Sequence, residues 1–308
     1  MGKHAYLIMA HNAEDLLCKL LMCLDDERND IYLHIDRKAR FSGKFLETVY
    51  KSRLILCDSI CVTWGGESQI EATLLLLKKS TSMGHYDYYH LISGQDYLLK
   101  TQNEIHNFFD SHQGLEFISC RKLSGKFVER IKFFYPFQEK FSRNSILGKI
   151  VRRTTVFIQK LLRIDRTRNA YKEYGIGALW FSITDKMARY VLSQEEEIRK
   201  HFFCGFCADE IYLQTIWLNS PFYREESRYH SGKKNHPFIQ ETNFDIMRAI
   251  DWTRGAGSSP YTYTASDYGM LMESECLFVR KVDMKKSGEL LTLLDAEIFA
   301  TTNQQIWG

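Results

Sequence analysis

The stretch "HAYLIMAHNAEDLLCKLLMCLDDERNDIYLHID", residues 4–36, decides the fold class of this chain. Residues 4–11 form a short apolar run that predicts a strand. Residues 12–24 have the apolar spacing of a helix, with Asn12 placed to cap it, and residues 30–36 predict a second strand. A strand, a helix and a second strand in this order are typical of a sheet whose strands run parallel.

The same alternation continues to about residue 120. We expect a helix at 42–50, strands at 53–57 and 60–64, a helix at 67–80, a strand at 86–93, a helix at 101–112 capped by Thr101, and a strand at 114–120. Strands that alternate with helices predict an α/β fold, in which a mostly parallel central sheet is flanked by helices on both faces.

The second half of the chain has a less regular pattern. We expect strands at 177–184 and 244–252, and helices at 185–202, 208–219, 264–275 and 287–299. With only four prolines and no low-complexity run, the chain offers no obvious linker. We therefore expect a single domain over residues 1–308, in which the elaborated C-terminal half closes one side of the sheet.

Composition excludes several classes of protein. The chain has 308 residues, of which 44% are hydrophobic, as in a globular protein with a large core. No segment approaches the roughly 20 apolar residues of a membrane span, and the amino terminus does not look like a signal peptide. We expect a cytoplasmic protein whose eight cysteines are reduced. A net charge of +3 is too small to imply a nucleic-acid partner.

The segment 141–172 is unusually basic. Its only acid is Asp165, and its apolar residues fall near helical spacing, which predicts a basic amphipathic helix. Its cations are Arg143, Lys149, Arg152, Arg153, Lys160, Arg163, Arg166, Arg168 and Lys172. Two interpretations stay open: a helix that lies on an anionic membrane surface, at the inner face of the cell membrane, or a solvated helix packed on the domain.

Polar residues gather where the predicted parallel strands end. His11 follows the first strand, Asp36 the second, Trp64 the fourth, and Gln95 and Asp96 follow the fifth. Ligands of such sheets bind beyond the carboxyl ends of the strands. Each position alone has an ordinary explanation in turn chemistry. Together they predict a nucleotide pocket.

Several phosphate-binding and catalytic motifs are missing from the sequence. There is no GxGxxG, no Walker loop, no GxSxG and no Asp-x-Asp pair. A protein that handles phosphate without a metal ion would need arginine and lysine instead. We therefore expect no metal site.

The stretch "CGFCADEIYLQT", residues 204–215, combines two cysteines with two adjacent carboxylates. Cys204 and Cys207 have the spacing of a redox or metal motif, but thiols that pack in the protein interior are the favoured interpretation. Asp209 and Glu210 stand at the start of a predicted helix, and neighbouring helical residues point about 100° apart. We therefore expect one of the two to cap the helix and the other to face a cleft.

Segments along nearly the whole chain resemble the core-2/I-branching β-1,6-N-acetylglucosaminyltransferase family, in the family's order. They are "AYLIMAHN" (5–12), "YLHIDRKA" (32–39), "VTWGGESQIEATLLLLK" (62–78), "YHLISGQDYLLKTQNEIHNFF" (89–109), "GALWFSIT" (177–184), "CADEIYLQT" (207–215) and "MLMESECLFVRKVD" (270–283). The resemblance implies a GT-A-type glycosyltransferase that uses a UDP-sugar, inverts the anomeric carbon and needs no divalent metal. Residues 1–120 would then be the nucleotide-binding half, and 121–308 the acceptor-binding and catalytic half.

The resemblance also assigns roles to residues. It implies that Glu210 is the catalytic base, which leaves Asp209 as the expected cap of the helix start. It also implies that Asp36 contacts the uridine and that Lys281 binds the diphosphate. His11 and Trp64 would be neighbours of the uridine, and Gln95 and Asp96 would serve either the substrate or the backbone of their own loop. The family's second basic phosphate ligand has no match in "SSPYTYTASDY" (258–268), and its possible substitutes are Arg280, Arg254 and Arg248.

The acceptor side of the family carries over less completely. Arg130 and Trp252 match acceptor-contacting residues, Arg254 stands where the mammalian enzymes have an aromatic, and Trp180 would stack on a sugar ring. The expected reaction is β-linked transfer of GlcNAc to a glycan or lipid-linked oligosaccharide, in bacterial surface polysaccharide synthesis. A donor such as UDP-xylose or UDP-glucose, or a non-catalytic membrane-associated scaffold, is the alternative. The membrane anchor and disulfide pattern of secretory members are missing, as expected of a bacterial cytosolic enzyme.

Overall fold

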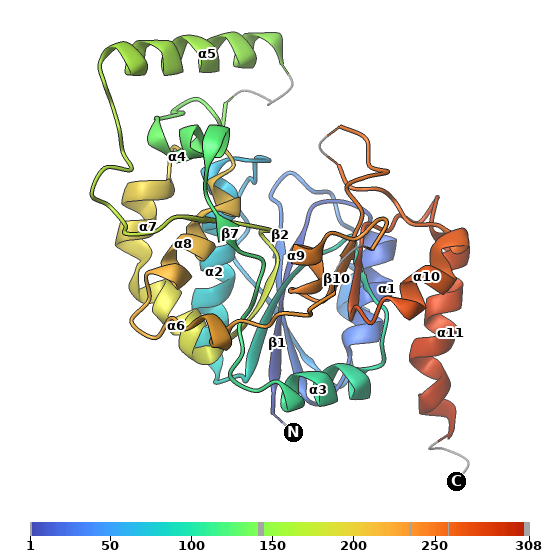
Figure 1. Cartoon of the computed structure of the whole chain (residues 1–308). Coiled ribbons are helices and arrows are strands. Elements are labelled where there is room, and N and C mark those ends of the chain that lie inside the picture. The colour runs from blue at the N-terminus through green and yellow to red at the C-terminus, as the bar shows by residue number, and fades with distance from the viewer. Residues whose placement is uncertain (1, 141–144, 234–235, 258, 305–308) are drawn as a thin grey trace.

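A six-stranded sheet forms the centre of the computed structural model, which describes residues 2–140, 145–233, 236–257 and 259–304 (Figure 1). Strands β1 to β4 are parallel, whereas β9 runs antiparallel to both of its neighbours. In spatial order the strands are β3 (Arg53–Leu56), β2 (Asn29–Ile35), β1 (His4–Ala10), β4 (Tyr88–Ser93), β9 (Phe181–Thr184) and β6 (Phe117–Ile118). The predicted mostly parallel sheet is confirmed.

Two smaller sheets and a set of helices complete the described fold. The smaller sheets are β10 (Arg248–Ile250), β11 (Phe278–Arg280) and β5 (Asp96–Leu98), and β7 (Arg121–Lys122) with β8 (Gly175–Ile176). The α-helices are α1 (Glu14–Leu24), α2 (Glu67–Met83), α3 (Gln102–Ser111), α4 (Glu129–Lys132), α5 (Ile146–Leu161), α6 (Asp185–Ser193), α7 (Glu195–Phe202), α8 (Tyr212–Leu218), α9 (Glu241–Phe244), α10 (Tyr268–Glu273) and α11 (Gly288–Gln304). The short 3-10 helices are η1 (Lys44–Glu47), η2 (Gly125–Val128), η3 (Ala208–Glu210), η4 (Glu225–Ser227) and η5 (Ala265–Asp267).

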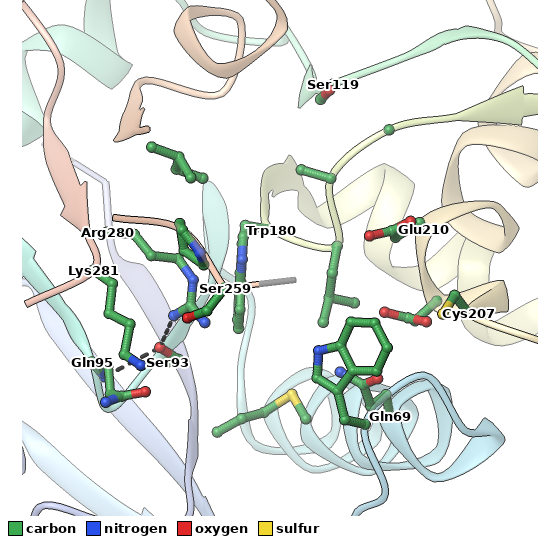
Figure 2. Close-up of a pocket in the computed structure, with 18 of the residues that line it drawn as sticks. Gln69, Ser93, Gln95, Ser119, Trp180, Cys207, Glu210, Ser259, Arg280 and Lys281 are labelled. Atoms are coloured by element: carbon green, nitrogen blue, oxygen red, sulfur yellow. Dashed lines mark hydrogen bonds between the residues drawn. The ribbon is translucent and has the colours of Figure 1, made fainter. Parts of the chain in front are cut away.

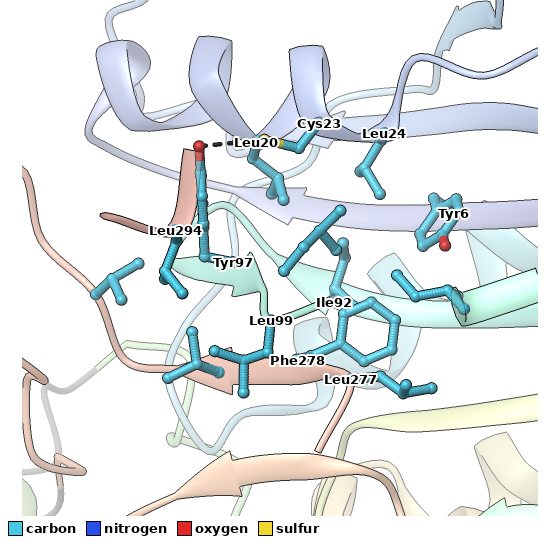
Figure 3. Packing of buried hydrophobic residues seen from close by; sticks show 14 of the residues in the cluster. Tyr6, Leu20, Cys23, Leu24, Ile92, Tyr97, Leu99, Leu277, Phe278 and Leu294 are labelled. Carbon is cyan, nitrogen blue, oxygen red and sulfur yellow. Dashed lines mark hydrogen bonds between the residues drawn. The ribbon is translucent and has the colours of Figure 1, made fainter. Parts of the chain in front are cut away.

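Both faces of the central sheet are buried under helices. Tyr6 and Ile8 of β1 belong to a core that includes residues of α1 and α11. Ala5 and Leu7, on the opposite face, belong to a core with residues of α2 and α6. Figure 3 shows part of the first core, where Leu20 and Leu294 surround Tyr97. Burial on both faces explains the nearly continuous apolar run of β1, since no position of such a strand faces water.

Three local predictions in the first half are wrong. Asn12 does not cap α1; Ala13, in the left-handed region at φ 56°, precedes the helix, and no side chain caps it. Residues 42–50 contain only the short η1. Residues 60–64 form a loop, because the end of β2 supplies side-chain acceptors: Ile60 N–H donates to His34 Nε2 (3.2 Å) and Val62 N–H to Asp36 Oδ2 (3.2 Å). The cap at Thr101 is confirmed, with Glu104 completing a capping box.

The second half was expected to close one side of the sheet, but it covers both faces, with α11 on one and α6 on the other. Both faces of this sheet present apolar side chains, so both need cover. Strand β11 pairs with β5, which brings Arg280 opposite Asp96, immediately after the end of β4. The predicted strand at 177–184 begins only at Phe181, and the predicted helix at 185–202 divides into α6 and α7 at Gln194. Among the described residues, no helix combines the length and the apolar character that crossing a membrane requires.

Candidate active site

A cavity of about 830 Å³ lies at the carboxyl ends of β1, β2 and β4, within the size range of small-molecule sites (Figure 2). It contains most of the residues that the sequence nominates. Those that line it are His11, Asp36, Trp64, Gln95, Trp180, Glu210, Trp252, Arg280 and Lys281. Asp96, Arg130 and Arg254 are not among the lining residues. The carboxyl-end rule for parallel sheets therefore located the cavity from the sequence.

Asp36 is nearly buried at the edge of the cavity and holds two loop segments. Its Oδ1 accepts a hydrogen bond from the backbone N–H of Lys38 (2.8 Å), and its Oδ2 accepts one from the N–H of Val62 (3.2 Å). Lys38 Nζ lies 3.6 Å from the same carboxylate. Asp36 thus has the turn role that the sequence left open, and it also faces the cavity.

Arg280 is fixed in place by acidic and aromatic neighbours. Its Nη1 donates to Asp96 Oδ1 (2.6 Å) and to the hydroxyl of Ser93, while its guanidinium lies 4.4 Å from the ring centre of Trp180. Asp96 is fully buried, and Ser93 N–H and Oγ also donate to it. Asp96 therefore serves the protein itself: it orients Arg280 toward the cavity and does not line that cavity.

Lys281 adds a second positive charge to this wall of the cavity. Burial and the adjacent charge of Arg280 lower the pKa of Lys281. No ion pair of Lys281 with a described residue is found. Two neighbouring cations that repel each other form a favourable site for an anion, since the anion relieves the repulsion.

The other two candidate phosphate ligands lie elsewhere. Arg248 is buried under the sheet and donates to the carbonyls of Ile246, Leu91 and Phe181. Arg254 pairs with Asp251 (2.5 Å) and Asp267 (2.7 Å), and its guanidinium packs between Phe238 and Tyr261.

Neither side chain lines the cavity. Of the three suggested substitutes, the structure therefore places Arg280 alone in the cavity. The position of Arg254 also fails to support the expected acceptor contact.

Glu210 ends η3 on the opposite side of the cavity and is held by an ion pair. Arg130 Nη1, on α4, donates to Glu210 Oε2 (2.5 Å), and the Glu210 side chain is 35% exposed. No hydrogen bond to Oε1 is found among the described residues. Arg130 thus acts on the cavity through Glu210, which fixes one carboxylate oxygen and leaves the other available to a substrate.

A close backbone contact fixes the loop of Glu210. Gly177 N–H donates to the carbonyl of Glu210 (2.9 Å). A Cβ atom at Gly177 would lie 1.7 Å from the carbonyl oxygen of Ser119, so only glycine fits there. The backbone at Gly177 and the loop of Glu210 therefore pack against each other without a side chain between them.

Asp209 does not have the capping role that we expected. Cys207, in the left-handed region, precedes η3, and no side chain caps that helix. Asp209 is buried against the cavity, and its Oδ1 has no hydrogen-bond partner among the described residues. Burial, together with the charge of Glu210, raises the pKa of Asp209 to about 7. Burial disfavours the charged carboxylate, and the nearby charge of Glu210 adds to this effect.

Neither Cys204 nor Cys207 forms a disulfide with a described residue, and no group of described residues could hold a metal ion. Cys207 is buried, and its N–H donates to the carbonyl of Gly65 (2.8 Å). A Cβ atom at Gly65 would lie 2.7 Å from the Cys207 sulfur. Cys204 N–H donates to Glu67 at the start of α2 (2.5 Å). These contacts agree with the packing interpretation: the residues Cys204 and Cys207 hold the loop of Glu210 against the start of α2.

Two tryptophans remain accessible at the cavity, and several other lining residues were not foreseen. Trp64 and Trp252 are 46% and 44% exposed, whereas one face of Trp180 is covered by Arg280. The polar lining residues that the sequence analysis missed include Lys38, Gln69, Ser119, Arg121 and Asn243. Lys38 follows β2 and Arg121 follows β6. The rule that ligands bind beyond the carboxyl ends of strands, which found Asp36, therefore also applies to these two residues. Gln69 and Asn243 reach the cavity from helices, where sequence gives no such signal.

Glu210 lies across the cavity from two cations. In Figure 2, Glu210 lies on one side, Arg280 and Lys281 lie on the other, and Trp180 stands between them. A carboxylate can accept a proton, and a pair of cations can stabilise a departing anion. The arrangement suits a displacement in which the nucleophile and the leaving group act from opposite sides of one carbon.

Comparisons with known proteins complete this description. No curated protein matches the chain. Among solved structures, S. aureus TarS is similar at a TM-score of 0.29 and 15% identity, over 42% of this chain and 24% of that one. Mouse xyloside xylosyltransferase 1 is similar at a TM-score of 0.30 and 11% identity, over 70% of this chain and 80% of that one. Likenesses this distant do not bear on function. The family model described as Core-2/I-Branching enzyme matches residues 4–272, and the chain belongs to that family of glycosyltransferases.

Proposed function

We propose that the protein is an inverting glycosyltransferase that moves a sugar from a UDP-sugar to a hydroxyl of a glycan acceptor. The observation that carries this proposal is the separation of Glu210 from Arg280 and Lys281 across one cavity (Figure 2). Inversion by a single displacement requires the base and the leaving group on opposite sides of the sugar. Membership of a glycosyltransferase family supports the same conclusion.

In the proposed reaction, Glu210 takes the proton of the acceptor hydroxyl as its oxygen attacks the anomeric carbon. The new carbon–oxygen bond forms while the bond from that carbon to the β-phosphate oxygen breaks, and the electron pair leaves with UDP. Arg280 and Lys281 stabilise the charge that develops on this diphosphate, in the role that a divalent ion has in other transferases. Asp36, His11 and Trp64 would hold the uridine beyond the ends of β1 and β2.

The donor sugar and the acceptor are the finer parts of the proposal. GlcNAc is the first choice because the family is named for branching enzymes that the sequence resembles. UDP-xylose and UDP-glucose are the alternatives. Trp252, half-exposed at the cavity, offers an aromatic face to an acceptor sugar. A lipid-linked oligosaccharide in bacterial surface polysaccharide synthesis is the proposed acceptor class.

A donor panel tests the proposal. UDP-GlcNAc, UDP-xylose and UDP-glucose are compared by thermal shift and by UDP release with glycan acceptors, each in EDTA and again with Mn²⁺. We expect one donor to raise the melting temperature and to release UDP at equal rates in both buffers. Activity that appears only with Mn²⁺ would contradict the metal-independent mechanism. UDP release from no donor, despite vesicle binding, would favour the non-catalytic scaffold.

A further inference from the structure

Helix α5 lies apart from the body of the protein. Figure 1 shows it beyond the carboxyl ends of the central strands, next to α4 and on the side of the sheet where the cavity lies. Only Gly148 and Gln159 are buried within it. The amide of Gln159 accepts a hydrogen bond from Phe134 N–H (2.7 Å) and donates one to the Phe134 carbonyl (2.8 Å). The helix is thus attached along one narrow face.

The opposite face of α5 is apolar and exposed. Ile146, Ile150, Phe157 and Leu161 follow one another at spacings of four, seven and four residues, which places them on one side of a helix. Their side chains and those beside them are strongly exposed: Ile146 (78%), Leu147 (57%), Ile150 (55%), Phe157 (62%), Ile158 (49%), Leu161 (68%) and Leu162 (68%). We call these seven residues the α5 stripe. Single exposed apolar residues are ordinary, but a continuous row marks an interaction surface.

Cations border this stripe, and α5 contains no acid. Lys149, Arg153 and Lys160 lie along one edge, since they are four and seven residues apart. Lys160 pairs with Glu129 (2.7 Å). No ion pair of Lys149, Arg153 or Arg163 with a described residue is found. These side chains are exposed, so their charges are available to a partner.

We propose that α5 is a membrane-surface helix, whose stripe inserts among the acyl chains of an anionic lipid leaflet while Lys149, Arg153 and Arg163 contact lipid phosphates. An apolar face bordered by cations is the pattern of helices that lie in the membrane interface. A plane of phosphates complements the charge of this edge. A second copy of α5 would bring like charges together, and a nucleic acid would leave the stripe exposed to water.

The position of α5 connects this surface to the cavity. Lys160 of α5 pairs with Glu129, the neighbour of Arg130, and the Arg152 guanidinium lies 4.8 Å from the ring centre of Phe206 in the loop of Glu210. A molecule seated on a membrane through α5 therefore holds the loop of Glu210 near the lipid surface. A lipid-borne acceptor would then reach the cavity on the side of Glu210. This last step rests on the transferase function proposed above.

Vesicle binding by the full chain tests the proposal. Co-sedimentation is measured with vesicles of phosphatidylcholine, and with vesicles that also contain phosphatidylglycerol, at low and high salt. We expect the protein to bind anionic vesicles at least about tenfold more tightly than neutral ones. Binding to the anionic vesicles should weaken at high salt. The variants Phe157→Asp with Leu161→Asp, and Lys149→Glu with Arg153→Glu, should each lose at least this much binding.

A matched control is Leu293→Asp, an exposed apolar residue on α11, which should bind anionic vesicles like the wild type. Thermal melting and UDP-sugar binding should be unchanged in all variants, because the substituted side chains are exposed and lie outside the cavity. The proposal is overturned by equal affinity for neutral and anionic vesicles, or by no binding to either. It is also overturned if sedimentation shows a dimer that Phe157→Asp abolishes. If the wild-type protein binds anionic vesicles but turns over no UDP-sugar, only the proposed transferase function would be contradicted.

Discussion

The cavity and helix α5 hold their charged side chains in opposite ways. In the cavity, Arg280 is fixed by Asp96 and Ser93, and Glu210 is fixed by Arg130. On α5, Lys149 and Arg153 lie along the edge of the α5 stripe, and no ion pair to a described residue restrains them. A reaction has one transition-state geometry, so its charged groups gain from being held in place. A lipid surface has no fixed pattern of phosphates, and long flexible cations adapt to it.

The two regions should therefore respond independently to substitution. Changes in the cavity should alter turnover and leave vesicle binding unchanged, whereas changes in the α5 stripe should do the reverse when a water-soluble acceptor is supplied. A cavity variant that loses vesicle binding, or an α5 variant that loses turnover of a water-soluble acceptor, would contradict this independence.

The largest effect is expected at Glu210. The variant Glu210→Gln keeps the size of the side chain but cannot accept the proton, so turnover should fall by about 10²- to 10⁴-fold. UDP binding, measured by thermal shift, and vesicle binding should stay at the wild-type level. The exposed Glu196 on α7 provides the matched control Glu196→Gln, with unchanged turnover. Near-normal activity of Glu210→Gln would remove the proposed base.

A second effect is expected at the cationic side of the cavity. Lys281→Ala removes a charge that faces the developing anion, so turnover should fall by about 10²-fold. The affinity for UDP, measured by calorimetry, should fall as well. Lys285→Ala, at an exposed neighbouring position, should change neither quantity. A Lys281→Ala enzyme with wild-type affinity for UDP would place the diphosphate elsewhere in the cavity.

A third effect concerns the pH dependence of stability at Asp209. Its pKa is raised to about 7 in the folded protein, so the fold binds this proton more tightly than the unfolded chain does. The free energy of unfolding therefore falls as pH rises from about 4 to 7, by at most about 4 kcal/mol. In Asp209→Asn, this decrease in the free energy of unfolding with pH should disappear. Urea unfolding at several pH values measures it.

Glu116 serves as an internal reference for that measurement. Burial raises the pKa of Glu116 to about 7. This carboxyl therefore also lowers the free energy of unfolding as pH rises, equally in the wild type and in Asp209→Asn. Its contribution cancels when the wild type and Asp209→Asn are compared. Parallel pH profiles of the two proteins would show that Asp209 keeps an ordinary pKa.

The smallest effect is expected at Gly177. Gly177→Ala would force a Cβ atom against the Ser119 carbonyl, so the backbone must shift at a cost of about 1–3 kcal/mol in the free energy of unfolding. Turnover should fall with it, since Gly177 supports the loop of Glu210. Gly269 in α10 meets no atom within 4 Å, so Gly269→Ala should be neutral or stabilising. Equal stability of both variants would show that the backbone near Gly177 accommodates a Cβ atom without cost.

Patterns that depend on near neighbours in the sequence were predicted well. The apolar runs of β1, β2 and β4 mark strands buried on both faces, and the polar residues after them mark the cavity. The cap at Thr101 depends on Glu104, three residues away. The amphipathic pattern of α5 was also visible, since it follows from helical spacing alone.

Contacts between distant segments escaped the sequence. Residues 60–64 resemble a strand, but His34 and Asp36 satisfy their backbone in a loop. Arg280 and Arg254 look equivalent as candidates, yet one turns to Asp96 and the cavity while the other is held by Asp251 and Asp267. Asp209 looks like a cap but is buried beside Glu210.

The sequence by itself determined the α/β class, the family and the candidate base, because these depend on local periodicity and on motifs read in order. Only the tertiary structure decided which arginine faces the cavity, that Arg130 holds Glu210, and that no described segment covers the apolar face of α5. The physical reason is that burial and ion pairing are set by residues far apart in the chain, which come together only when the sheet and its helices have packed.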